Sequence, residues 1–149
     1  MNFVVSTQNQ TLTVLDGDRE LWSAPVSTSK HGLGEESGSY RTPRGRLQVC
    51  EKIGDGAAPG TVFKGRQPTG AIWTPGQVTD EDLILTRILW LEGLDPGNQN
   101  TRERTIYFHG TNHEELIGQP ASLGCIRLRN NDILRLYDLA EIGTQVLIQ

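Results

Sequence analysis

The sequence predicts one mostly β domain, sandwich-like in its pattern, with a single helix near the C-terminus and few other short helices. The 149-residue chain is about one ordinary domain long, so it can bury a hydrophobic core. Short runs of partly alternating apolar and polar residues, bounded by turn residues, recur along most of its length. No internal repeat or low-complexity segment divides residues 1–149. We therefore treat the whole chain as one domain.

The first third of the chain predicts a β-meander. Turn residues at Asn9-Gln10 and Asp16-Gly17-Asp18 separate its short apolar runs. Thr42-Pro43-Arg44-Gly45 predicts a further turn just before a cleanly alternating run. Strands are expected at 3–5, 11–15, 21–26 and 47–53.

Gly54–Gly76 is rich in glycine and proline and contains one short β-like run, at 61–64. A loop of this length inside a compact domain is usually functional or mobile. The residues alone leave two interpretations open, a functional segment or a plain solvent-exposed connection.

The rest of the chain alternates strands with one helix. Residues 83–91 are apolar enough for a central strand, and residues 105–108 predict a strand that ends at His109. The helix is expected to begin at Asn131 as its N-cap, with Asp132 in its first turn, where a negative charge suits the helix dipole. Its buried face is Ile133, Leu136, Tyr137 and Ala140; Gly143 ends it, and a last strand spans 145–148.

Composition argues against two classes of partner. The formal net charge is −4, and the 14 lysines and arginines are scattered among 18 acidic residues, so no nucleic-acid surface is expected. No apolar run approaches the roughly 20 residues that a membrane span needs. The N-terminal residues lack the features of a signal peptide, so a cytoplasmic protein is expected if this is the native start. Two cysteines fit a reducing compartment.

Ile106–Leu128 contains the residues most indicative of function. His109 follows an apolar run, and Cys125 lies sixteen positions later, between Gly124 and Ile126-Arg127. A histidine can take the proton of a cysteine thiol, and the resulting thiolate can attack a carbonyl carbon. Acyl transfer is therefore the leading hypothesis. Cys50, in an alternating strand without such neighbours, is expected to be a small buried apolar residue.

The spelling of this segment resembles the catalytic motif of the L,D-transpeptidase (YkuD-type) family. That motif is HG, a spacer, and S-x-G-C-[IVA]-R-[LM]; here His109-Gly110 is followed by eleven residues and then by SLGCIRL. The chain resembles the short, leaderless, cytosolic L,D-carboxypeptidase-like members in particular. Many members have a second histidine just before the Gly-Cys pair, and this chain has Leu123 there. The resemblance implies the family's catalytic fold and a lid at Gly54–Gly76.

The expected catalytic residues are Cys125 as nucleophile and His109 as the general base that later protonates the leaving amine. The resemblance implies that the Gly110 carbonyl orients the imidazole, so no acidic partner is needed, and Glu114 and Glu115 are expected on the solvated surface. The Cys125 amide, next to Gly124, is the expected oxyanion donor, because a glycine there lets the backbone approach the scissile carbonyl.

Three further residues are expected near the site. Ser122 either holds the catalytic loop by hydrogen bonding or is a solvated turn serine. Arg127 either binds a substrate carboxylate by its planar fork or braces the loop. Tyr107 and Trp90 are candidate cleft walls, with core packing the favoured interpretation for both, and Tyr107 is the one named as a substrate-binding candidate.

The resemblance also implies the substrate, a peptidoglycan stem tetrapeptide cut between its third residue, a diamino acid, and the terminal D-alanine. Water as acceptor gives L,D-carboxypeptidation, which suits the trimming of recycled muropeptides in the cytosol and is favoured. An amine acceptor gives a 3–3 cross-link, which is L,D-transpeptidation. No cofactor is expected, and carbapenem β-lactams are expected ligands whose reaction Leu123 can alter.

Two other hypotheses remain open. A non-catalytic muropeptide-binding module would have been free to lose the thiol, the histidine or the glycine, yet Cys125, His109 and Gly124 are all present. A zinc site built from Cys125, His109 and His113 lacks the usual ligand spacing and leaves the SLGCIRL string unexplained.

Overall fold

The computed structural model describes all residues, 1–149, and contains ten strands and one α-helix. Two single-turn 3-10 helices lie at Pro96–Asn98 and Glu114–Leu116. The helix α1 spans Asn130–Leu139. The strands are β1 Asn2–Ser6, β2 Thr11–Asp16, β3 Arg19–Pro25, β4 Gly45–Ile53, β5 Thr61–Lys64, β6 Gln67–Ile72, β7 Ile84–Gly93, β8 Tyr107–Gly110, β9 Ile126–Leu128 and β10 Gln145–Ile148.

All ten strands belong to one mixed sheet, whose main path is β3-β2-β1-β10-β4-β7-β5-β6. β4 and β5 follow one another along one edge of β7, and β8 lies on its other edge with β9 beyond. The β1–β10 and β8–β9 pairs are parallel and the others are antiparallel. The mostly β prediction is confirmed, and β7 is the central strand that its apolar sequence predicts.

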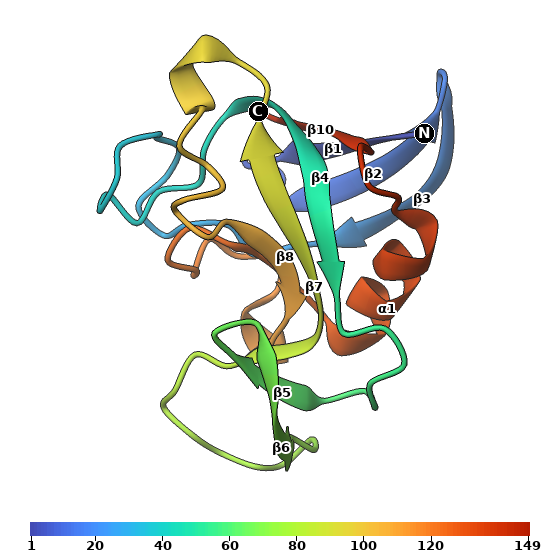
Figure 1. Ribbon diagram of the computed structural model, residues 1–149, viewed down its shortest axis with the longest axis vertical. Helices are drawn as coiled ribbons and strands as arrows, with labels where there is room; N and C mark the ends of the chain where they lie inside the picture. The colour runs from blue at the N-terminus through green and yellow to red at the C-terminus, as the bar shows by residue number, and fades with distance from the viewer.

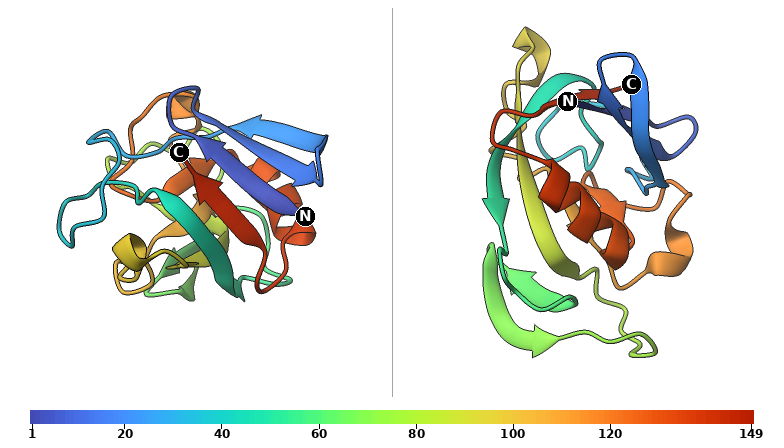
Figure 2. Two further views of the ribbon diagram at one scale, coloured as in Figure 1. Left: turned by 90° about the horizontal axis from the view of Figure 1, so that it is seen from above. Right: turned by 90° about the vertical axis from the view of Figure 1, so that its right-hand side faces the viewer.

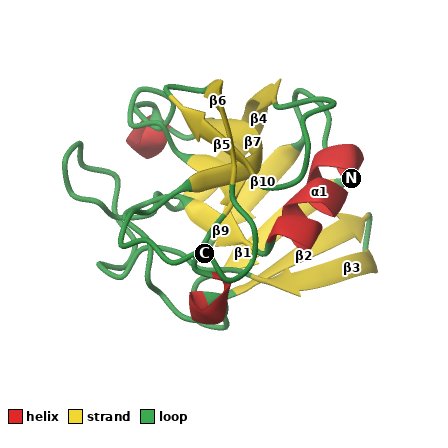
Figure 3. Cartoon of the chain, turned by 90° about the horizontal axis from the view of Figure 1, so that it is seen from below, coloured by secondary structure: helices red, strands yellow, loops and turns green.

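The main core lies between this curved sheet and α1, which packs on β7 and β8 (Figure 3). Phe3 on β1 meets Phe108 on β8 edge to face, with ring centres 6.3 Å apart, so strands far apart in the sheet order share one core. The largest fully buried members are Phe3, Leu12, Leu47, Leu89, Leu91, Phe108, Ile126, Leu128, Ile133 and Leu136. Burial of such side chains supplies the main favourable free energy of folding.

The Gly54–Gly76 segment contains more structure than its composition predicts. β6 follows β5 to form a hairpin, although all six β6 residues are exposed and so give no alternating apolar pattern. Residues 54–60 of this segment are irregular, and a second irregular loop, 73–83, begins in the segment and runs on to β7. Hairpin and loop project from the end of the molecule opposite the two termini (Figures 1 and 2).

The helix prediction was wrong at both ends. α1 begins at Asn130 with Arg129 in the N-cap position, so Asn131 lies inside the first turn. The backbone N–H of Asn130 has no partner within the helix and donates to the Glu114 carboxylate at 2.8 Å. Glu114 thus replaces the N-cap side chain that usually accepts a hydrogen bond at a helix start. The helix ends at Leu139, and Gly143, with φ +91°, forms the later turn into β10. The predicted buried face is correct. No helix here has the length and apolarity needed to cross a membrane.

Candidate active site

β7, β8 and β9 bring the two motif halves onto one face of the sheet. His109 lies directly opposite Arg127, and Phe108 lies opposite Ile126. Successive side chains of a strand alternate between faces, so Phe108 and Ile126 point into the main core while His109 and Arg127 point away from it. Cys125, two residues before Arg127, faces the same side as His109 and packs beside Tyr107. The register between β8 and β9 therefore brings His109 and Cys125, sixteen positions apart in the sequence, into one site.

His109 is fixed in one orientation. It is 2% exposed, and its Nδ1 lies 2.6 Å from the Gly110 carbonyl oxygen. A carbonyl can only accept, so Nδ1 must have the proton and Nε2 has the free lone pair of a base. A side chain at Gly110 would overlap the Leu85 carbonyl oxygen at 2.8 Å and the Asn130 amide oxygen, which explains the glycine after the histidine.

Cys125 is held as a thiol. Its Sγ lies 3.4 Å from the Thr105 carbonyl oxygen, to which it donates, and accepts from the Tyr107 amide at 3.4 Å. Burial raises the pKa of the Cys125 thiol from 9.0 to about 11, against the opposing effect of the Tyr107 amide. Burial likewise lowers the pKa of His109, although its bond to Gly110 acts in the other direction. At neutral pH the resting pair is therefore a neutral thiol and a neutral imidazole.

No hydrogen bond joins Cys125 to His109 in this resting arrangement, because the thiol proton is directed to the Thr105 carbonyl. The two side chains share a face of adjacent strands, so rotation of the cysteine side chain can redirect Sγ. Catalytic hydrogen bonds are often completed only when substrate binds.

Ser122 shapes the turn that presents Cys125. Its hydroxyl, 1% exposed, donates to the Cys125 carbonyl at 2.6 Å and accepts from the Gly124 amide at 3.2 Å. Thr42 donates to the Gly124 carbonyl at 3.0 Å from another part of the chain. The Cys125 amide donates to no group of the protein and is free to bind an oxyanion.

The backbone conformation at Gly124 gives a second reason for a glycine, beside the expected approach to the scissile carbonyl. Its φ is +126°, a conformation that residues with a side chain rarely adopt. An added Cβ would meet its nearest neighbours at 3.4 Å, an ordinary contact distance. Backbone conformation, rather than crowding by neighbouring protein atoms, is therefore what the fold demands of Gly124.

Arg127 is buried and already paired. It is 4% exposed, and its Nη2 lies 2.5 Å from the carboxylate of Asp82 in the loop 73–83. Three more contacts fix the end of this loop. The Asn112 side chain accepts from the Leu83 amide at 3.0 Å and donates to the Glu81 carbonyl at 2.9 Å, and a His113 ring nitrogen lies 3.1 Å from the same carbonyl. Of the two expected roles, bracing is the one whose contacts are formed.

The β5–β6 hairpin reaches the site from the other side. At its tip, Arg66 donates to the Tyr107 hydroxyl at 3.1 Å and lies over the Trp90 ring at 4.5 Å. Trp90 and Tyr107 meet edge to face at 5.7 Å, and Tyr107 is 5% exposed. Tyr107 is thus both a core residue and the wall against which Cys125 packs.

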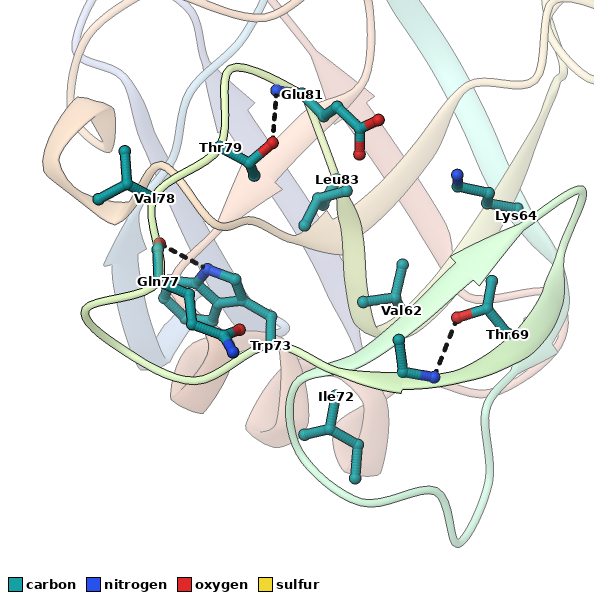
Figure 4. Close-up of a pocket in the computed structure, with 11 residues that line it drawn as sticks. Val62, Lys64, Thr69, Ile72, Trp73, Gln77, Val78, Thr79, Glu81 and Leu83 are labelled. Atoms are coloured by element: carbon teal, nitrogen blue, oxygen red, sulfur yellow. Dashed lines mark hydrogen bonds between the residues drawn. The ribbon is translucent and has the colours of Figure 1, made fainter.

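A cavity of about 700 Å³ lies between the hairpin and the loop (Figure 4). Its apolar walls include Val62, Trp73 and Leu83, and Lys64 and Glu81 add one charge of each sign. It does not include Cys125 or His109, but the loop that forms one wall holds Asp82 against Arg127.

Sequence reasoning missed Asp82, Arg66 and Thr105 as parts of this site. Asp82 lies in a run of three acidic residues, and nothing in that run indicates which of them binds Arg127. Arg66 follows Gly65, and this glycine could have predicted a hairpin turn with Arg66 at its tip. The expectation for Glu114 was wrong, because it binds the start of α1, while Glu115 is exposed. No group of three His, Cys, Asp or Glu side chains is placed to hold a metal ion, so the zinc alternative finds no ligand set.

Comparison with known proteins gives concordant results. The family model for the L,D-transpeptidase catalytic domain, YkuD, matches residues 2–148. The putative L,D-transpeptidase YqjB of Bacillus subtilis is 42% identical over 50 residues, which are 34% of this chain and 28% of that protein.

Solved structures extend the likeness to the fold. An L,D-transpeptidase from Mycobacterium smegmatis matches with a TM-score of 0.59 and 21% identity, over 99% of this chain and 57% of that one. L,D-transpeptidase 3 from Mycobacterium tuberculosis, in complex with a faropenem-derived adduct, matches with a TM-score of 0.58 and 16% identity, over 99% of this chain and 59% of that one. This chain thus covers less than two thirds of each relative. With the motif residues on one face of the sheet and a family match from residue 2 to residue 148, this chain belongs to the L,D-transpeptidase catalytic domain family.

Proposed function

We propose that this chain catalyses cysteine-dependent acyl transfer on peptidoglycan stem tetrapeptides and cleaves the bond between the diamino acid and the terminal D-alanine. The observation that supports it most is the shared face of Cys125 and His109, with Nδ1 of the histidine bound to Gly110 and Nε2 left free. The named relatives are L,D-transpeptidases, which agrees with this chemistry.

Acylation begins when the thiol leaves the Thr105 carbonyl and gives its proton to Nε2 of His109. Sγ then forms a bond to the carbonyl carbon of the diamino acid, and the carbonyl oxygen becomes an oxyanion that the Cys125 amide stabilises. As this intermediate collapses, the C–N bond breaks and His109 returns the proton to the nitrogen of D-alanine, which leaves as the free amino acid. A thioester on Cys125 remains.

Deacylation uses the same base. His109 takes a proton from water, the hydroxide oxygen bonds to the thioester carbon, and the C–S bond breaks with Cys125 recovering the proton. The product is a tripeptide.

We favour water as the acceptor because of Leu123, which is 48% exposed beside the catalytic turn. An acceptor amine arrives at neutral pH as an ammonium, which has no lone pair, so it must lose a proton before it can attack, whereas water needs no such prior step. Leucine cannot take that proton, whereas the histidine that many relatives have at this position can. His109 alone suffices for hydrolysis.

Transpeptidation is the second candidate, because the named relatives are transpeptidases. Acylation by β-lactams is part of the same proposal: one relative was solved with a faropenem-derived adduct, and the strained four-membered ring of a carbapenem presents Cys125 with a carbonyl carbon to attack.

The test is incubation of the purified protein with disaccharide tetrapeptide, followed by mass spectrometry, with Cys125→Ala as control. Loss of one alanine, giving tripeptide without dimer in the wild type alone, supports hydrolysis. Cross-linked or D-amino-acid-exchanged products would make the chain a transpeptidase. Binding without turnover in both proteins would favour a non-catalytic muropeptide-binding module.

A further inference from the structure

A row of four side chains crosses the sheet at the level of Cys125. Glu51 on β4 lies opposite Trp90 on β7, and Trp90 lies opposite Tyr107 on β8. Phe108 of β8 pairs with Ile126 of β9, so the residues just before them, Tyr107 and Cys125, lie side by side. All four residues therefore face the side of the sheet that displays His109.

Arg66 lies over the middle of this row, in contact with both Trp90 and Tyr107. It reaches the row from the hairpin tip, where Gly65 has φ +55° and Arg66 has φ +64°. The second of these conformations is unfavourable for a residue with a Cβ, and glycine or asparagine is usual at such a tip. The contacts of the guanidinium with the row offset that strain.

Arg66 is also a cation without an anionic partner. It forms no ion pair, and only one of its five N–H donors is used. The other arginine on the Trp90 ring, Arg102, lies 4.9 Å from the ring centre and is paired with Glu51 at 2.5 Å. Arg66 is therefore the guanidinium of this row that can accept a carboxylate from outside.

The surroundings of Arg66 contain both signs of charge. It lines a cavity of about 650 Å³ together with the carboxylates of Glu51 and Asp55 and the apolar side chains of Ile53 and Phe63. Ile53 and Phe63 belong to the cluster against which Tyr107 and Cys125 pack. A ligand with a carboxylate and an ammonium on one carbon suits such a lining, because the fork of Arg66 binds the first and the acids attract the second.

The distance from Cys125 to Arg66 sets how far the carboxylate and ammonium of such a ligand must lie from the carbonyl that Cys125 attacks. Neighbouring strands are about 5 Å apart, so Tyr107 and Trp90 lie about 5 and 10 Å from Cys125. The two amino-acid centres of a diaminopimelate are separated by four C–C bonds, about 5 Å when extended. With the first centre at Cys125, the second can thus reach the guanidinium of Arg66.

We propose that Arg66 and this cavity bind the zwitterionic amino-acid end of the side chain of the third stem residue. The inference rests on the proposed function. It makes Arg66 a specificity-determining residue that selects a diamino dicarboxylic acid, such as meso-diaminopimelate, over lysine, which has the ammonium but lacks the carboxylate.

The test measures kcat/KM for release of the terminal D-alanine from four synthetic tetrapeptides. The third residue is meso-diaminopimelate, its D-centre carboxamide or L-lysine, and the fourth peptide is the diaminopimelate form with a C-terminal amide. We expect the wild type to prefer diaminopimelate over the carboxamide and lysine. We expect Arg66→Gln to lower kcat/KM for the diaminopimelate peptide by about 10- to 100-fold and to leave the lysine peptide unchanged.

Arg102→Gln is the matched control, since Arg102 lies on the same ring but is paired with Glu51, and it should retain the preference for diaminopimelate. An equal effect of Arg66→Gln on all four peptides would overturn the proposal. So would a loss of discrimination confined to the C-terminal acid and its amide, because the carboxylate bound would then be that of the terminal residue.

A binding measurement separates this proposal from the proposed function. Calorimetry with Cys125→Ala and with the Cys125→Ala, Arg66→Gln double variant needs no turnover. Weaker binding of the diaminopimelate peptide by the double variant, with unchanged binding of the lysine peptide, supports the role of Arg66 even if the wild type releases no alanine. Equal affinities in a protein that does release alanine would overturn the role of Arg66 alone.

Discussion

The site is built from two regions that differ in how they are held together. The floor, made by β8, β9 and the Ser122–Cys125 turn, rests on backbone pairing and on a buried apolar core beneath it. The cover, made by the β5–β6 hairpin and the loop 73–83, packs on the floor through Phe63 of β5, which lies in one cluster with Tyr107 and Cys125. The hairpin tip and the loop meet the floor through polar side chains, Arg66 with Tyr107 and Asp82 with Arg127. Most of β6 and of the loop is exposed.

With the proposed function, the residues for catalysis and those for substrate choice lie in parts of different stability. Regions with few buried apolar contacts open locally at a lower free energy than a packed core. The floor can therefore hold Cys125 and His109 in place while the cover moves to admit a peptide. Substitutions in the floor and in the cover should therefore have different effects on activity, stability and amide exchange.

Removal of the base should give the largest effect. His109→Ala leaves the thiol of Cys125, whose pKa is raised by burial, without a proton acceptor. We expect kcat to fall by about 10²- to 10⁴-fold, as for other general bases, together with some loss of stability, because the imidazole is buried. Turnover assays with the tetrapeptide check this, and a loss below tenfold would contradict the assignment.

The pH dependence of thiol alkylation should reveal the resting state of the floor. With a pKa of about 11, the fraction of Cys125 thiolate rises tenfold per pH unit, so labelling by iodoacetamide should rise about 1,000-fold between pH 7 and pH 10. A Cys50→Ser background confines the label to Cys125. A fast rate that is constant from pH 6 to pH 9 would instead indicate a thiolate–imidazolium pair.

The core under the floor should be intolerant of truncation. Phe108 is fully buried between His109 and Tyr107 in the chain and packs on Phe3. Phe108→Ala should lower the free energy of unfolding by about 3–5 kcal/mol through lost burial and the cavity it leaves. Chemical denaturation measures this value. Ile72→Ala, on the exposed strand of the cover, is the contrasting variant and should change it by less than about 0.5 kcal/mol.

Loss of the loop contact should loosen the cover more than it destabilises the fold. Asp82→Asn leaves the buried guanidinium of Arg127 without its anion, but Asp82 itself is partly exposed, so we expect only about 1 kcal/mol of global destabilisation. Amide exchange of residues 73–83 should accelerate. Asp80→Asn, an exposed neighbour without an ion pair, should leave this exchange unchanged. Unaltered exchange in Asp82→Asn would show that the contact does not restrain the loop.

The smallest effect is expected for the substitution of Asn131, in the first turn of α1. Asn131→Ala should alter stability by less than about 0.5 kcal/mol, because Asn131 is not the cap. Asn130→Ala should cost about 1–3 kcal/mol, since its amide group bonds to Thr86 and to the Thr111 carbonyl. Thermal unfolding of the two variants measures the difference. A larger loss of stability in Asn131→Ala than in Asn130→Ala would indicate that Asn131 is the helix cap.

Much of the fold could be predicted from local pattern. Alternation identified strands where one side faces the core, as in β1, β2 and β4, and the apolar spacing identified the buried face of α1. The local sequence pattern did not predict β6, because all its residues are exposed and none alternates with a buried one. It also misplaced the start of α1, because the residue that caps it, Glu114, lies sixteen positions before Asn130.

The sequence by itself determined the family and the mostly β fold class, and it identified Cys125, His109, Gly110 and Gly124 as the candidate catalytic residues, because these follow from residue type and spacing along the chain. Only the tertiary structure decided which side chains meet. Registry across β7, β8 and β9 places Cys125 beside Tyr107 and His109 opposite Arg127. Burial then decides that the thiol and the imidazole are neutral at rest, and the folded cover brings Asp82 and Arg66 to them. Contacts of this kind depend on distances between segments far apart in the chain, and no local sequence pattern contains those distances.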